Sequence, residues 1–73
     1  MNKTELKQKV KVLFEEVTKV NVVLKDVTLL EADNYGVNLI ANVGTFRLEA
    51  SFQNIDLYSH GKHIATVKRP MSI

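Results

Sequence analysis

Two histidines, a lysine and a tyrosine lie close together in residues 57–67, LYSHGKHIATV, and these side chains could do chemistry. His60 and His63 are the only imidazoles of the chain, and Asp56 precedes both. Two histidines and a carboxylate are a set that can hold a transition metal. A histidine near a hydroxyl, here that of Ser59, is also the pairing that activates a nucleophile.

The same residues favour a tight turn. Glycine adopts positive φ without strain, and histidine is enriched there, so His60 and Gly61 suit a two-residue hairpin loop. In that hairpin Tyr58 and His63 are cross-strand neighbours on one face, whereas Ser59 projects to the other face. His60, in the loop, need not point where His63 points. We therefore expect a turn, with no metal site, no catalytic residue and no cofactor.

Composition excludes further classes of protein. The 73 residues suffice for one small domain, 1–73, and the absence of cysteine excludes disulfides and thiolate zinc sites. The three glycines are isolated, so no glycine-rich phosphate loop is present. No apolar run is long enough to span a bilayer, and the first ten residues do not resemble a signal peptide. We expect a cytoplasmic protein without enzymatic activity.

The net charge of +2 is unevenly distributed. Residues 1–11 hold four lysines and one glutamate, residues 12–56 hold three basic and seven acidic groups, and residues 57–73 hold three basic groups. Both ends are therefore basic and the middle is acidic. This pattern differs from the continuous basic field of a dedicated nucleic-acid-binding protein.

The first segment has the pattern of an amphipathic helix, which we place at about residues 3–19. Asn2 can cap its N-terminus, and Glu5, three residues later, can complete a capping box. Apolar residues then recur at helical spacing. The stripe consists of Leu6, Val10, Leu13 and Val17.

Beyond the helix the hydrophobic period changes to two, which is typical of strands. The expected strands cover about residues 21–32, 35–42, 45–52, 55–59 and 62–68, followed by a frayed tail at 70–73. Turns are expected at Asp33-Asn34, Val43-Gly44, Gln53-Asn54 and His60-Gly61. The sequence thus predicts an α+β fold in which one N-terminal helix packs on one face of a four- to five-stranded antiparallel β meander.

Cross-strand pairing supports this arrangement, because apolar residues meet apolar residues at each turn. The second turn pairs Leu39 with Leu48 and Tyr35 with Phe52, and the third pairs Phe52 with Ile55. All of these side chains are expected to face the helix.

The opposite, outer face of the sheet is the first candidate interaction surface. Its expected residues are Val27, Leu29, Ile40, Arg47, Tyr58 and His63. An apolar centre with tyrosine and arginine is typical of protein interfaces. Two alternatives remain at this stage. The first strand can bulge near Lys25-Asp26 so that part of it joins the core, or the face can be covered by a second copy of the chain.

The second candidate surface is a lysine ridge on the helix, formed by Lys3, Lys7 and Lys11 at i,i+4 spacing. An anionic partner would explain three like charges on one edge, although lysine stems also cover apolar stripes without any partner. With Lys62, Lys68 and Arg69, this ridge would make a weak nucleic-acid-binding protein.

The pattern as a whole favours a small non-enzymatic protein-binding module that docks through the outer sheet face or an edge strand. An inhibitor or accessory factor of a bacterial or phage genome would suit this size. Nucleic-acid binding is the alternative. The pattern leaves open whether the first strand is an edge or closes a small barrel.

Overall fold

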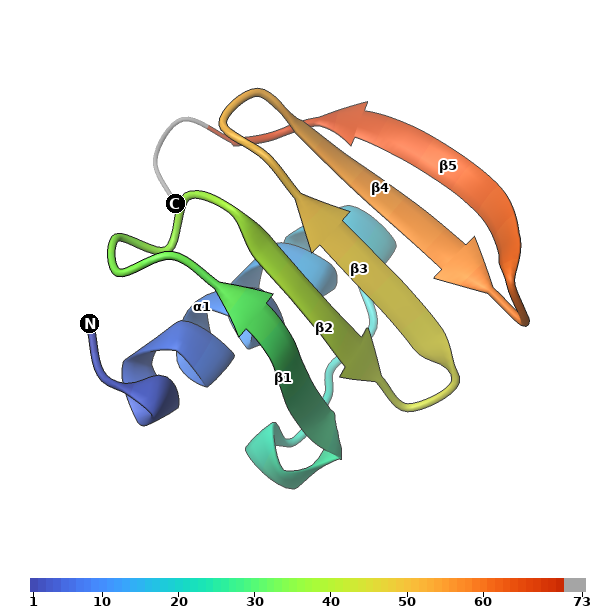
Figure 1. Ribbon diagram of the computed structural model, residues 1–73. Coiled ribbons are helices and arrows are strands. Elements are labelled where there is room, and N and C mark those ends of the chain that lie inside the picture. Colours follow the sequence, from blue (N-terminus) through green and yellow to red (C-terminus); the bar gives the residue numbers. More distant parts are fainter. Residues whose placement is uncertain (71–73) are drawn as a thin grey trace.

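The computed structural model describes residues 1–70, which form one helix and one five-stranded sheet (Figure 1). The elements are α1 (Lys3–Thr18), the 3₁₀ turn η1 (Leu24–Asp26), β1 (Val27–Ala32), β2 (Leu39–Val43), β3 (Phe46–Ala50), β4 (Asn54–Ser59) and β5 (Lys62–Lys68). The strands pair antiparallel in the order β1-β2-β3-β4-β5. The α+β class is therefore confirmed, and the sheet is open, with β1 and β5 as its edges. Of the predicted tail, residues 71–73 lie outside the described residues.

Helix α1 begins and ends as its sequence predicts, within one residue. The Asn2 side chain accepts a hydrogen bond from the Glu5 backbone N–H (2.8 Å), and the Glu5 carboxylate accepts one from the Asn2 N–H (3.1 Å). At the other end Lys19 adopts φ 60°, a left-handed conformation that stops the helix. The capping box fixes where the apolar stripe starts and therefore which face meets the sheet.

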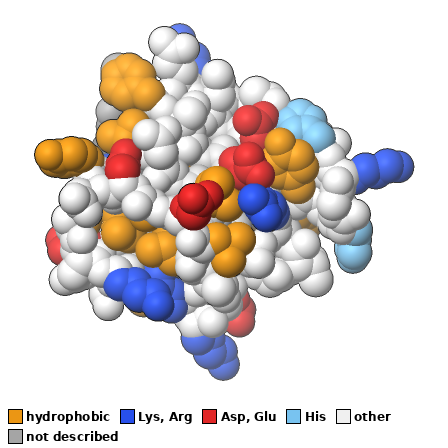
Figure 2. All heavy atoms as spheres, viewed as in Figure 1, with side chains coloured by type: hydrophobic (Ala, Val, Ile, Leu, Met, Phe, Trp, Pro, Cys, Tyr) orange, Lys and Arg blue, Asp and Glu red, His pale blue; other side chains and the backbone are white. Residues whose placement is uncertain are grey.

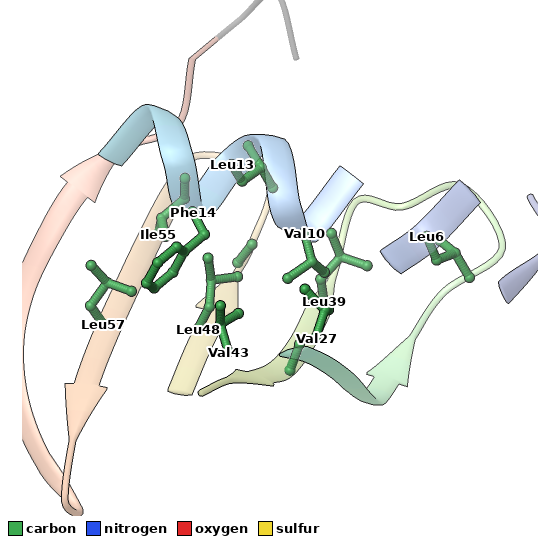
Figure 3. Packing of buried hydrophobic residues seen from close by; sticks show 12 residues of the cluster. Leu6, Val10, Leu13, Phe14, Val27, Leu39, Val43, Leu48, Ile55 and Leu57 are labelled. Atoms are coloured by element: carbon green, nitrogen blue, oxygen red, sulfur yellow. The ribbon is translucent and has the colours of Figure 1, made fainter. Parts of the chain in front are cut away.

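The core lies between α1 and one face of the sheet, as Figure 3 shows. It consists of Leu6, Val10, Leu13, Phe14, Val27, Leu39, Ala41, Val43, Leu48, Ala50, Ile55 and Leu57. Phe14 packs against Phe46 with ring centroids 5.7 Å apart. A single layer of side chains thus lies between the helix and the sheet. The side chains on the other face of the sheet are not part of this core.

Three of the four predicted hairpin registers are wrong. Leu39 pairs with Ala50 rather than Leu48, and Ile55 also pairs with Ala50 rather than Phe52. Both differences equal two residues, so the side chains of the paired strands stay on the predicted faces. The first of these two turns is accordingly displaced by one residue, to Gly44-Thr45, and the second covers residues 51–53.

The first predicted turn is replaced by a longer loop, residues 33–38. The Asp33 carboxylate accepts hydrogen bonds from the backbone N–H groups of Tyr35, Val37 and Asn38. Because one side chain satisfies three backbone donors of this segment, these residues form a loop rather than the start of a strand. Strand β2 therefore begins at Leu39 instead of residue 35.

The first predicted strand is also shorter than expected. Residues 24–26 form η1, with the Asp26 N–H bonded to the Val23 carbonyl (3.0 Å), and β1 then starts at Val27. A register shift between Leu29 and Glu31 leaves Leu30 as an extra residue. The alternative of an irregular first strand is correct, and the irregularity moves both Val27 and Leu29 to the core side.

Candidate functional site

The predicted turn at His60-Gly61 is confirmed, whereas the pairing of Leu57 with Ile64 that it implied is wrong, because Leu57 pairs with Ala65 past a bulge at Ile64. His60 has φ 53° and Gly61 φ 76°, and Tyr58 pairs with His63 across β4 and β5. The two rings meet edge to face, with centroids 5.2 Å apart. The stretch that carries the imidazoles is thus a turn that places His63 on the outer face beside Tyr58.

A hydrogen-bonded cluster surrounds His63. Its Nε2 lies 3.0 Å from Asp56 Oδ1 and 2.8 Å from Thr66 Oγ1, while Thr66 donates to Asp56. The hydrogen bond from Thr66, followed by that from His63, lowers the pKa of Asp56 below its ordinary value of 3.8. This carboxylate therefore remains ionised at neutral pH.

The cluster does not align a nucleophile with a base. A relay through histidine uses both ring nitrogens, whereas Asp56 and Thr66 share Nε2 of His63. Ser59 instead lies 3.0 Å from Nδ1 of the other histidine, His60. Residues 1–70 contain no group of three His, Asp or Glu side chains placed to hold a metal ion. The arrangement can orient charge on a surface and bind a partner's polar groups.

The outer face carries two rows of side chains that cross the sheet. One row consists of Thr28, Asn42, Arg47, Tyr58 and His63, and the next of Glu31, Ile40, Glu49, Asp56 and Thr66. Arg47 Nε joins the two rows through Glu49 Oε2, 2.8 Å away. In the space-filling view of this face, acidic, basic and hydrophobic side chains gather over the middle of the sheet (Figure 2).

Two hollows flank the Arg47–Glu49 pair. One, of about 280 Å³, has Ile40 in its lining together with the carboxylates of Glu31, Glu49 and Asp56. The other, of about 440 Å³, is lined by Tyr58, Arg47 and residues of the two hairpin turns. Both are shallow depressions rather than enclosed cavities, so they suit side chains of a partner better than a small molecule.

Four of the six predicted interface residues lie on this face: Ile40, Arg47, Tyr58 and His63. The placement of Val27 and Leu29 there is wrong. Val27 is 1% exposed in the core, and Leu29 packs against the core. The β1 bulge at Leu30 is the reason, because one extra residue exchanges the two faces of a strand. The face is consequently more polar than the sequence predicts.

The predicted basic set is spread over the molecule. Lys3 is exposed and Lys7 half-buried on α1, Lys11 pairs with Glu15 (3.3 Å), and Lys62 and Lys68 lie at opposite ends of β5. Arg69 is 7% exposed and donates to backbone carbonyls of two loops. Burial lowers the pKa of Arg69, and the charge of Asp33 opposes that effect. The guanidinium group of Arg69 is thus bound to carbonyls of the protein itself and does not contribute to a basic surface.

The sequence analysis missed two exposed aromatic residues. Tyr35 is 79% and Phe52 70% exposed, although both were expected to face the helix. Each lies in a loop, in the segments ADNYG and SFQN. An aromatic residue flanked by Asp, Asn, Ser and Gly was the available indication of a loop position.

Comparisons with known protein families, curated proteins and solved structures find no match for this chain. Within residues 1–70, no helix has the length and apolar character needed to cross a bilayer.

Proposed function

We propose that this protein is a small non-enzymatic binding module that docks another protein on the outer face of its sheet. The observation that carries the proposal is that α1 covers only one face, so the two rows around Arg47 lie open to a partner. Tyr58 and Ile40 supply half-buried apolar surface there. Tyrosine and arginine are the residues that most often dominate binding energy at such surfaces.

Pre-formed contacts make this face suitable for docking. Arg47 is held by Glu49 and His63 by Asp56, so a partner meets side chains whose positions are already restricted. Ordering fewer side chains on association lowers the entropic cost of binding. We also propose a cytoplasmic location, because a chain without cysteine suits a reducing compartment.

The edge strands are the less favoured docking route. Both edges carry a bulge, at Leu30 in β1 and at Ile64 in β5, and Lys62 and Lys68 flank β5. Bulges and lysines are the devices that discourage strand addition at a sheet edge. Phosphate binding by the lysine ridge, the earlier alternative, is also less favoured because Lys11 is ion-paired and Arg69 is buried.

Site-specific photo-crosslinking in the native cell tests the proposal. A photoreactive amino acid at Asn42 on the outer face should give a discrete protein adduct, and the same group at the exposed Gln8 of α1 should not. Adding Tyr58→Ala with Ile40→Asp should remove that adduct. Identical adducts from both positions, or none from Asn42, would refute docking on this face.

Light scattering over a concentration and salt series separates a foreign partner from a second copy. A monomer at all concentrations is expected, because charged side chains surround Ile40 and Tyr58. A dimer that persists in high salt and is disrupted by Ile40→Asp would show that the face is closed by self-association.

A further inference from the structure

Two loops at one end of the sheet, residues 33–38 and 51–53, are fixed by the protein itself (Figure 1). In the first, the Asp33 carboxylate binds three backbone N–H groups, and the Asp33 N–H donates to the Asn38 carbonyl (3.1 Å). In the second, the Ser51 N–H donates to the Asn54 carbonyl (2.8 Å). These hydrogen bonds define the backbone of both loops, from which their exposed side chains project.

Arg69 connects the two loops. Its guanidinium donates to the carbonyl of Gly36 (2.8 Å) and to that of Val37 in the first loop, and to the Ser51 carbonyl (3.0 Å) in the second. The Arg69 N–H also donates to the Gln53 carbonyl (2.8 Å). The loops are therefore one unit with β5, and we call them the Arg69-linked loops.

Each of these loops exposes one aromatic ring, Tyr35 in the first and Phe52 in the second. Phe52 borders an open hollow of about 400 Å³, together with Gln53, Asn54 and Lys68. The residues that line this hollow thus include a phenylalanine, two residues with side-chain amides and a lysine. These are the groups that bind a nucleobase by stacking, by hydrogen bonds to its edge, and through its phosphate.

The charges at this end favour an anionic ligand. The N-terminal ammonium group of Met1 lies 2.9 Å from the Asn34 carbonyl, and the Lys9 stem underlies Gly36. Lys68 borders the hollow. The Asp33 carboxylate accepts hydrogen bonds from loop donors, and that of Asp56, two residues from Asn54 on β4, is bonded to His63 and Thr66. Positive groups therefore lie beside both aromatic rings without a free carboxylate on these loops.

We infer that the Arg69-linked loops bind single-stranded nucleic acid, with one base stacked on Phe52 and a phosphate at Lys68. Tyr35 offers a second stacking surface. A lipid surface would favour the rings and lysines but leave the amides of Gln53 and Asn54 facing apolar chains. Asn54 and Lys68 form the next cross-strand pair beyond Asp56 and Thr66, so the hollow lies at the end of the outer face. Binding there depends on Phe52, whereas protein docking depends on Tyr58 and Ile40.

Fluorescence anisotropy with short labelled oligouridylate and oligothymidylate tests this inference on the whole protein. Binding should saturate and weaken as salt rises. Phe52→Ala should weaken it roughly tenfold, the size of one lost base stack. Phe52→Leu should weaken it similarly, because leucine keeps the apolar surface but not the ring. Lys68→Glu should weaken it and lower the salt slope by about one.

Tyr58→Ala is the matched control, since it removes an aromatic ring from the outer face and should leave oligonucleotide binding unchanged. Thermal unfolding verifies that each variant folds, which is expected because Phe52 and Lys68 are exposed. The inference is overturned if neither oligonucleotide binds at low salt, or if Tyr58→Ala matches Phe52→Ala. Binding to phosphatidylserine vesicles alone, retained by Phe52→Leu, would also overturn it in favour of a lipid surface.

Discussion

Arg69 shows how one side chain can hold two loops together although no short sequence motif predicts this role. It was expected at a basic surface and instead supplies donors to backbone carbonyls of two loops. No local pattern distinguishes this arginine from an exposed one, because its acceptors lie 18 to 33 residues away. Buried arginine is tolerated when its fork of donors is satisfied, as it is here.

Arg69→Ala should lower the free energy of unfolding by about 3 kcal/mol, because it leaves backbone carbonyls without their donors. Urea unfolding followed by circular dichroism measures the effect. Lys68→Ala, at the adjacent exposed position, is the control and should stay within about 0.5 kcal/mol of the parent. Equal midpoints for the two variants would mean that the loops do not depend on Arg69.

The hydrogen bonds to the Asp33 carboxylate predict how the stability of the protein depends on pH. Hydrogen bonds from the backbone N–H of Asn38, then of Val37 and Tyr35, lower its pKa in the folded protein below the ordinary 3.8. Above about pH 5 the group is ionised in both states, so its stabilisation is complete. As pH falls, the unfolded chain binds the proton first, and the stabilisation is lost through the folded pKa.

The stability of Asp33→Asn should therefore depend less steeply on pH in acid than that of the parent protein. Urea unfolding midpoints, measured from neutral to acidic pH, give this dependence. Part of the slope should remain, because the pKa values of Asp56 and Glu15 are lowered too, by hydrogen bonds from Thr66 and Val22 respectively. An unchanged slope in Asp33→Asn would contradict this account of the loop.

At the scale of elements, the helix and the faces of β2 to β4 were predictable, while the face of β1 and most of the strand registers were not. The capping box and apolar stripe are local, and they placed α1 within one residue. A two-residue register error keeps every side chain on its face, so hydrophobic alternation cannot reveal it. The register next to the His60-Gly61 turn was predicted correctly because the turn residues specify it, but it holds only as far as Tyr58 and His63, where a bulge at Ile64 shifts it by one residue.

The residues of the candidate site were likewise predictable where the strands are regular and not where a strand bulges. Residues of the regular strands β2 to β4, such as Ile40, Arg47 and Tyr58, fell on the expected face. Residues next to the bulge, Val27 and Leu29, did not, because a one-residue insertion reverses the alternation. Whether either surface binds a partner remains a prediction.

Leu13→Ala tests the single layer of contacts between α1 and the sheet. Leu13 is 0% exposed, and its truncation should cost about 2–5 kcal/mol. A domain of this size has a total stability on the order of 5–10 kcal/mol, so much of it should be lost. Gln8→Ala, on the exposed side of the same helix, should be nearly neutral. Thermal and urea unfolding compare the two variants.

For the molecule as a whole, the meander has a consequence for the speed of folding. Every strand pairs with its neighbour in sequence, so the sheet assembles from short-range contacts, which favours rapid folding. The Arg69 contacts to Gly36 and Val37 close loops of 33 and 32 residues, respectively, and should form after the hairpins. In stopped-flow experiments, Arg69→Ala should then accelerate unfolding and leave refolding nearly unchanged. A slowed refolding rate would place this arginine in the folding nucleus instead.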